Sequence, residues 1–158
     1  MQFFLHLKPF YIYNFILLIV FSTIVNPNND LYIFYNALYC IFHFLLVYLA
    51  LYHYRKILYI IYFLYGLFLD ILWFNEIGPH ILFFISILIF MKFSIKYLYN
   101  FNPIKIYILL LCLEILMIFF EMLFSYLLFD YMFDLKFIMQ IFFLSIILSF
   151  PVFLFFSK

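Results

Sequence analysis

Six long apolar runs, separated by short polar breaks, are the feature of this sequence that most constrains its fold. A transmembrane helix needs about 20 mainly apolar residues, and most of the runs have about that length. They cover residues 10–25, 31–54, 57–73, 79–99, 104–129 and 137–157. Pro, Gly or Asn stands in several of the breaks, and these residues end helices and form turns. The sequence therefore predicts an all-α fold, with one polytopic membrane domain of about six transmembrane helices over residues 1–158.

The composition also favours lipid as the natural solvent of this chain. Hydrophobic residues make up 72% of the 158 residues and charged residues only 9%, whereas a typical soluble domain is about a quarter charged. Too few polar side chains are present to cover a globular surface in water. The formal net charge of +1 provides no basic surface for a nucleic acid. The lipid bilayer is therefore the expected environment, and no nucleic acid is expected as a partner.

The Lys and Arg residues predict the orientation, because cytoplasmic loops collect them. If the N-terminus is inside, seven of the eight are cytoplasmic and only Lys136 is outside. Both termini are then cytoplasmic and the chain is a multi-pass protein. The first apolar run follows Lys8, as in a signal peptide, but residues 22–26 do not form a typical cleavage site. We therefore expect this run to be retained as an anchor.

Ionisable side chains inside the apolar runs are candidate functional residues, since each costs about 2.5–3.5 kcal/mol at the membrane centre. Glu114 and Glu121 are seven residues apart on the fifth predicted helix and therefore share a face. His43 lies near the middle of the second predicted helix. We expect all three to contact a partner helix or a neighbouring helix of this chain, and a proton or ion path is the alternative. No residues have metal-ligand spacing, so no metal site is predicted.

Both glycines of the chain lie within residues 63–80. Gly66 and Asp70 are four residues apart and share a helix face, so the glycine allows a neighbouring helix to approach beside a carboxylate. Gly78 and Pro79 form a turn, and Pro79 suits the first position of the next helix. The sequence therefore predicts a tight hairpin of the third and fourth helices, with Asp70 and His80 at one end.

This hairpin resembles the rod-shape-determining membrane protein family MreD. The resemblance rests on Gly66, Asp70, Gly78 and His80, which follow the family pattern of Gly-x-x-x-Asp, a Gly-containing turn and a helix opened by a polar residue. The chain length, the six predicted spans, the cytoplasmic termini and the acidic positions of the fifth helix are also similar to that family. Trp-Phe at 73–74 and Glu76 depart from it, because small or polar turn residues are usual there.

The resemblance implies a non-enzymatic protein of the bacterial inner membrane, without a cofactor. It implies a membrane scaffold that couples the cytoskeleton to peptidoglycan synthesis. The implied partners are an MreC-like bitopic membrane protein, an MreB-like actin homologue and the wall-elongation synthases. The implied fold is a six-helix bundle similar to the substrate-binding subunits of energy-coupling-factor transporters. The residues themselves show no catalytic triad pattern and no Gly-rich phosphate loop, which agrees with a protein that is not an enzyme.

Three other interpretations remain open from the sequence. A small-molecule binding subunit of a membrane transporter would require polar residues from several helices to converge on a ligand. An enzyme acting on lipid would use Asp70, His80 and Glu76 as a metal or acid–base site near the outer interface. A respiratory-complex subunit encoded in an organelle is suggested only by the bias toward Phe, Ile and Tyr.

Overall fold

The structure is a computed structural model that describes residues 32–74, 77–98, 101–130 and 132–156, together with Ile16 and Ile19. This part of the chain is all-helical, which confirms the predicted all-α class for it. Its five helices are α2 (Tyr32–Tyr52), α3 (Ile57–Phe74), α4 (Pro79–Leu98), α5 (Pro103–Phe129) and α6 (Leu135–Phe156). Each helix begins and ends within two residues of one of the apolar runs. The first predicted run, 10–25, lies outside the described residues except at Ile16 and Ile19.

Two of these helices are long and apolar enough to cross a membrane, as judged by length and composition alone. They are the segments Pro79–Tyr97 of α4 and Pro103–Leu128 of α5. The core helices of soluble proteins meet the same criterion, but in this chain only 28% and 33% of an 18-residue apolar stretch within each segment is buried. The apolar segments of α2, α3 and α6 are shorter by this measure. Two such helices are compatible with a membrane protein and fall short of the six predicted spans.

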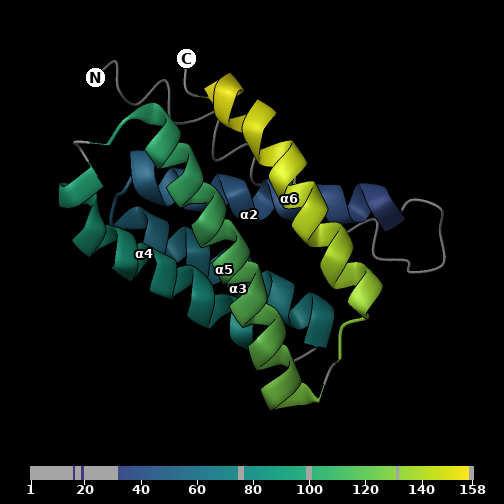
Figure 1. Cartoon of the computed structure of the whole chain (residues 1–158). Helices are drawn as coiled ribbons and strands as arrows, with labels where there is room; N and C mark the ends of the chain where they lie inside the picture. Colours follow the sequence, from purple (N-terminus) through teal and green to yellow (C-terminus); the bar gives the residue numbers. More distant parts are fainter. Residues whose placement is uncertain are drawn as a thin grey trace.

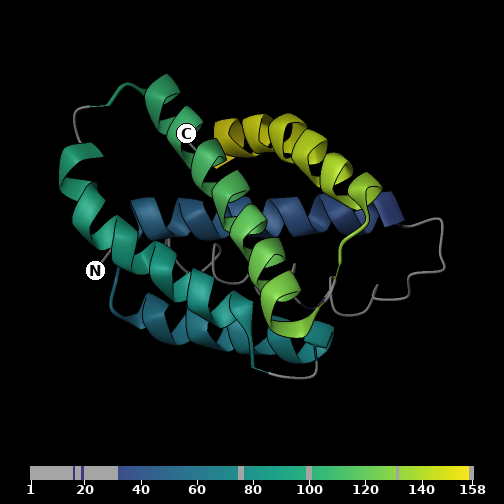
Figure 2. The same ribbon diagram turned by 60° about the horizontal axis from the view of Figure 1, so that its bottom comes forward.

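Helix α2 lies at the centre of the bundle (Figure 1). It packs against α4, α5 and α6, and α3 packs along α4 as a hairpin. Figure 2 shows the same arrangement from a second direction, with α3 and α6 on opposite sides of α2. From Asn36 to Leu51, nearly every side chain of α2 is buried. Polar residues of α2 therefore face other helices and not the surroundings.

The core and the outward faces of the bundle are both apolar. The largest fully buried side chains include Phe44, Tyr62 and Phe84. Large hydrophobic side chains are also exposed on the outward faces of four helices, for example at Ile60, Phe93, Ile108, Phe119 and Phe143. Soluble monomers rarely expose contiguous apolar patches larger than a few hundred Å². The outward faces therefore suit contact with lipid or with other apolar helices.

Proline residues mark the start of two helices. Pro79 is the first residue of α4 and Pro103 the first residue of α5, a position where the missing N–H of proline costs nothing. The C-terminal cap of α5 is Asp130, which has a φ of 51° and donates its N–H to the carbonyl of Tyr126. This left-handed residue closes the last turn of α5 before the chain enters α6.

Candidate functional site

Gly66 of α3 lies close against the backbone of α4. A Cβ atom built at Gly66 would lie 2.6 Å from the Cα atom of Ile81 and 2.7 Å from its backbone nitrogen. Real Cβ atoms essentially never make contacts this short, so a glycine is required for this packing. Neither glycine of the chain has a positive φ. Gly66 is therefore required because no Cβ atom fits there. The turn at Gly78 does not depend on a left-handed backbone.

Asp70 of α3 caps the first turn of α4 from the neighbouring helix. Its Oδ1 atom accepts the backbone N–H of His80 at 3.0 Å, and its Oδ2 atom accepts the N–H of Ile81 at 3.2 Å. Such N–H groups at the start of a helix have no partner within the helix. The Asp70 side chain is completely buried. The positive end of the α4 dipole therefore stabilises a carboxylate that water does not reach.

His80 extends this contact toward the centre of the bundle. Its Nδ1 atom lies 2.7 Å from Asp70 Oδ1. Its Nε2 atom, on the other side of the ring, lies 3.9 Å from Oε2 of Glu121. Side chains from α3, α4 and α5 thus come together at one buried place. This place lies beside the C-terminal end of α3 and the N-terminal end of α4.

Glu121 of α5 connects these groups to the central helix α2. Its Oε2 atom accepts a hydrogen bond from the Tyr39 hydroxyl at 2.7 Å and lies 3.0 Å from Nε2 of His43. Tyr39 and His43 are four residues apart on α2 and therefore share a face. All of these side chains are buried. We call the set Tyr39, His43, Asp70, His80 and Glu121 the polar cluster.

Buried aromatic rings pack against the histidines of the polar cluster. The ring of Phe84 on α4 lies 5.7 Å from the ring of His43 and 6.1 Å from that of His80, centroid to centroid. Phe42 lies 5.6 Å from His43 on the α2 side. Such apolar surroundings lower the local dielectric and strengthen the interactions among charged groups.

The second carboxylate of α5, Glu114, lies outside the polar cluster. It is buried, and neither of its carboxylate oxygens has a hydrogen-bond partner within the described part of the chain. Its neighbours are Ser145 of α6 and Cys40 of α2. The predicted common face of Glu114 and Glu121 thus points into the bundle, where Glu121 and His43 form an interhelical contact. Glu114 has polar neighbours on α2 and α6, and neither carboxylate faces the outside of the bundle.

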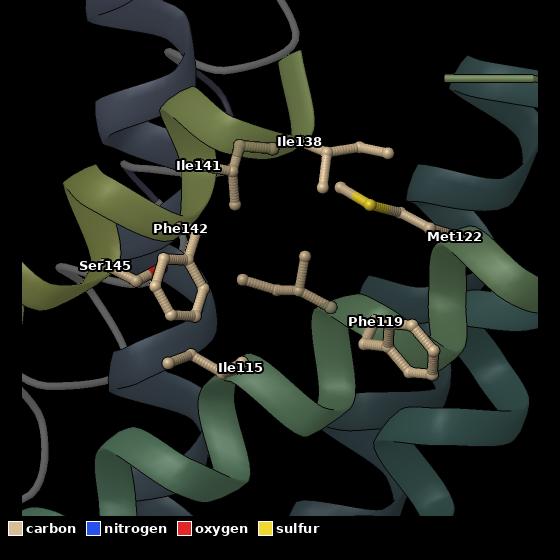
Figure 3. Close-up of a pocket in the computed structure, with 8 residues that line it drawn as sticks. Ile115, Phe119, Met122, Ile138, Ile141, Phe142 and Ser145 are labelled. Atoms are coloured by element: carbon tan, nitrogen blue, oxygen red, sulfur yellow. The ribbon is translucent and has the colours of Figure 1, made fainter. Parts of the chain in front are cut away.

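An open pocket of about 80 Å³ lies between α5 and α6, apart from the polar cluster (Figure 3). Apolar side chains form almost all of its lining, and Ser145 is its only polar residue. The residues that line it are Ile115, Ile118, Phe119, Met122, Ile138, Ile141, Phe142 and Ser145. A pocket of this composition suits apolar groups and offers almost nothing to orient a polar ligand.

The proposed metal or acid–base site of Asp70, His80 and Glu76 includes a residue outside the described part, since Glu76 lies there. Among the described residues, no group of three or more His, Cys, Asp or Glu side chains is arranged to hold a metal ion. Tyr39 is the member of the polar cluster that sequence analysis missed. Its spacing of four residues from His43 was the available signal, but 16 tyrosines in the chain make that signal weak.

Comparisons of the chain with protein-family models, with curated proteins and with solved structures find no match. A function for this protein is therefore argued from its residues and their geometry.

Proposed function

We propose that this chain is a non-enzymatic scaffold of the bacterial inner membrane, of the MreD type, which couples the cytoskeleton to peptidoglycan synthesis. The role of Asp70 carries the proposal. Both of its carboxylate oxygens accept hydrogen bonds from the first turn of α4, so this residue of the MreD-like motif is used to build the hairpin. A carboxylate that served catalysis or ligand binding would be expected to face a cleft.

Six membrane crossings are part of this proposal. The five described helices have between 18 and 27 residues, which at 1.5 Å per residue is about 27–40 Å. The hydrocarbon core of a bilayer is about 30 Å thick. The apolar run 10–25 would supply the sixth crossing and place both termini in the cytoplasm. The large exposed hydrophobic side chains on the outward faces support this arrangement.

The proposed partners are an MreC-like bitopic membrane protein, an MreB-like actin homologue and the wall-elongation synthases. Glu114 and Glu121 point into the bundle, so they are not available to a partner helix in lipid. In lipid, helices associate through close packing and polar contacts, because no hydrophobic force drives them together. Partner contacts would therefore use the apolar outward faces, including the pocket between α5 and α6, and the helix ends.

Depletion of the protein in the bacterium that encodes it tests this proposal. We expect depleted cells to lose their rod shape, because lateral wall synthesis is no longer coupled to the cytoskeleton. Re-expression of the wild-type chain should restore the shape, whereas Asp70→Leu should not. Leu64→Ala is the matched control for folding, because Leu64 lies on the same helix and is exposed, and it should accumulate in the membrane in wild-type amount. Normal shape and an unchanged pattern of new wall material after depletion would show that the proposal is wrong.

A small-molecule binding subunit of a transporter is the second candidate function. One observation favours it, since polar side chains from four helices converge inside the bundle, as a binding subunit requires. These side chains contact one another, however, and the pocket between α5 and α6 is apolar. This function predicts that depletion abolishes the uptake of a solute and leaves the cell shape unchanged.

A further inference from the structure

Both ring nitrogens of His43 face oxygen atoms. Nδ1 lies 2.8 Å from the carbonyl oxygen of Tyr39, and Nε2 lies 3.0 Å from Oε2 of Glu121. A neutral imidazole carries one N–H and presents a lone pair at its other nitrogen. A carbonyl oxygen only accepts hydrogen bonds, so Nδ1 carries the proton of the neutral ring. The contact between Nε2 and Oε2 then needs a second proton, bound either to His43 or to Glu121.

We propose that the contact between His43 Nε2 and Glu121 Oε2 is a proton-binding site, which takes up one proton per chain into the interior of the bundle. Without this proton, a nitrogen lone pair would face a carboxylate oxygen at 3.0 Å in apolar surroundings, which is repulsive. With it, the contact is a hydrogen bond that joins α2 to α5, and this bond is charge-assisted when the proton is on Nε2. This inference goes beyond the proposed scaffold function and does not depend on it.

The other members of the polar cluster do not supply the proton between His43 Nε2 and Glu121 Oε2. The Tyr39 hydroxyl donates to the same Oε2 atom of Glu121, so it stabilises negative charge there. Nε2 of His80 lies 3.9 Å from this oxygen, which is too far for a hydrogen bond. Nδ1 of His80 is already directed at Asp70. The four ionisable groups His43, Asp70, His80 and Glu121 have a formal charge of −2 with both histidines neutral, and the added proton makes it −1.

Further titratable groups lie on the helices that surround His43 and Glu121. They do not supply a positive charge in place of this proton. Glu114 lies two turns away along α5, next to Ser145. The Tyr62 hydroxyl of α3 donates to the carbonyl of Leu46. The described lysines of α4, α5 and α6 are all exposed, at positions 92, 96, 105 and 136. These exposed lysines therefore do not substitute for the proton.

NMR spectroscopy of the full chain in lipid nanodiscs, with 15N-labelled histidine and 13C-labelled glutamate, tests the proposal. The nitrogen shifts distinguish an N–H from a lone pair, and the carboxyl shift distinguishes a protonated from an ionised Glu121. In the wild-type protein we expect Nδ1–H on His43, together with one proton either on Nε2 or on the Glu121 carboxyl group. This measurement on the wild-type chain needs no variant to fold.

Glu121→Gln removes the acidic partner and keeps the size of the side chain. Its amide can donate to the Nε2 lone pair, so we expect a neutral His43 with Nδ1–H only, whichever of the two groups holds the proton in the wild-type protein. Glu114→Gln is the matched control, because it makes the same change on the same face of α5, and it should leave the His43 signals unchanged.

Three results would overturn the proposal. An Nε2–H tautomer of His43 with unprotonated Nδ1 and ionised Glu121 would account for the contact without a second proton. Unprotonated Nε2 beside an ionised Glu121, with stoichiometric zinc found by elemental analysis, would identify a metal site instead. A His43 ring that stays doubly protonated in Glu121→Gln would show that the carboxylate does not set the protonation of the ring.

Discussion

Gly66→Ala is expected to separate α3 from α4 and to destabilise the protein by about 3 kcal/mol. The added methyl group would lie 2.6 Å from the Cα atom of Ile81, and backbone atoms cannot rotate away as a side chain can. Overpacking of a core usually costs about 1–3 kcal/mol, and a contact with backbone belongs at the upper end. The measurement is the midpoint of SDS-induced unfolding of the purified protein in mixed micelles, followed by circular dichroism.

The control for this prediction is Leu64→Ala on the same helix. Leu64 is 54% exposed, so its truncation leaves no cavity in the core and should change the unfolding midpoint little. If Gly66→Ala unfolds at the same SDS fraction as the wild-type protein, the close approach of the two backbones is not required for stability.

Asp70→Leu is expected to cost about 3–5 kcal/mol, because each buried donor that loses its acceptor costs about 1–3 kcal/mol. The change leaves the backbone N–H groups of His80 and Ile81 and the His80 ring without their acceptor. Asp70→Asn keeps one carbonyl oxygen as an acceptor, so the loss should be about 1–2 kcal/mol. The same unfolding experiment measures both variants.

Asp134→Asn is the matched control for the Asp70 variants. Asp134 is an exposed carboxylate just before α6, and exposed substitutions usually change stability by less than about 0.5 kcal/mol. Wild-type stability in both Asp70→Asn and Asp70→Leu would show that the carboxylate does not hold the hairpin together.

The helices could be located from the sequence because the signals that bound them are local. Pro79 and Pro103 stand at the first positions of α4 and α5, and proline suits that position in any fold. Long apolar runs between such residues predict helices. The spacing of Gly66 and Asp70 likewise depends on one helix only, so their common face could be read directly.

The contacts between helices could not be located in this way. Glu114 and Glu121 look equivalent in the sequence, since both are acidic and lie on one face of one helix. In the structure, Glu121 meets His43 and Tyr39 of α2, whereas Glu114 lies beside Ser145 of α6. The difference depends on how α2 and α6 cross α5, and crossing geometry is set by packing along the whole bundle.

The polar cluster shows the same limit for histidines. His43 and His80 are 37 positions apart along the chain, and each alone reads as a polar residue in an apolar helix. Nε2 of His43 lies 3.0 Å and Nε2 of His80 lies 3.9 Å from the same oxygen of Glu121. This happens only because α2, α4 and α5 pack together at these residues. Sequence spacing within one helix carries no information on such a three-helix contact.

The multi-pass arrangement on which the proposed function rests is tested most directly by cysteine labelling of whole cells. Cys40 and Cys112 are first replaced by alanine, and single cysteines are placed at 55, 76, 105 and 134. We expect a membrane-impermeant maleimide to label positions 76 and 134 in intact cells, and positions 55 and 105 only after the membrane is permeabilised. Labelling of positions 55 and 76 from the same side of the membrane would contradict the arrangement, because α3 would then not cross it.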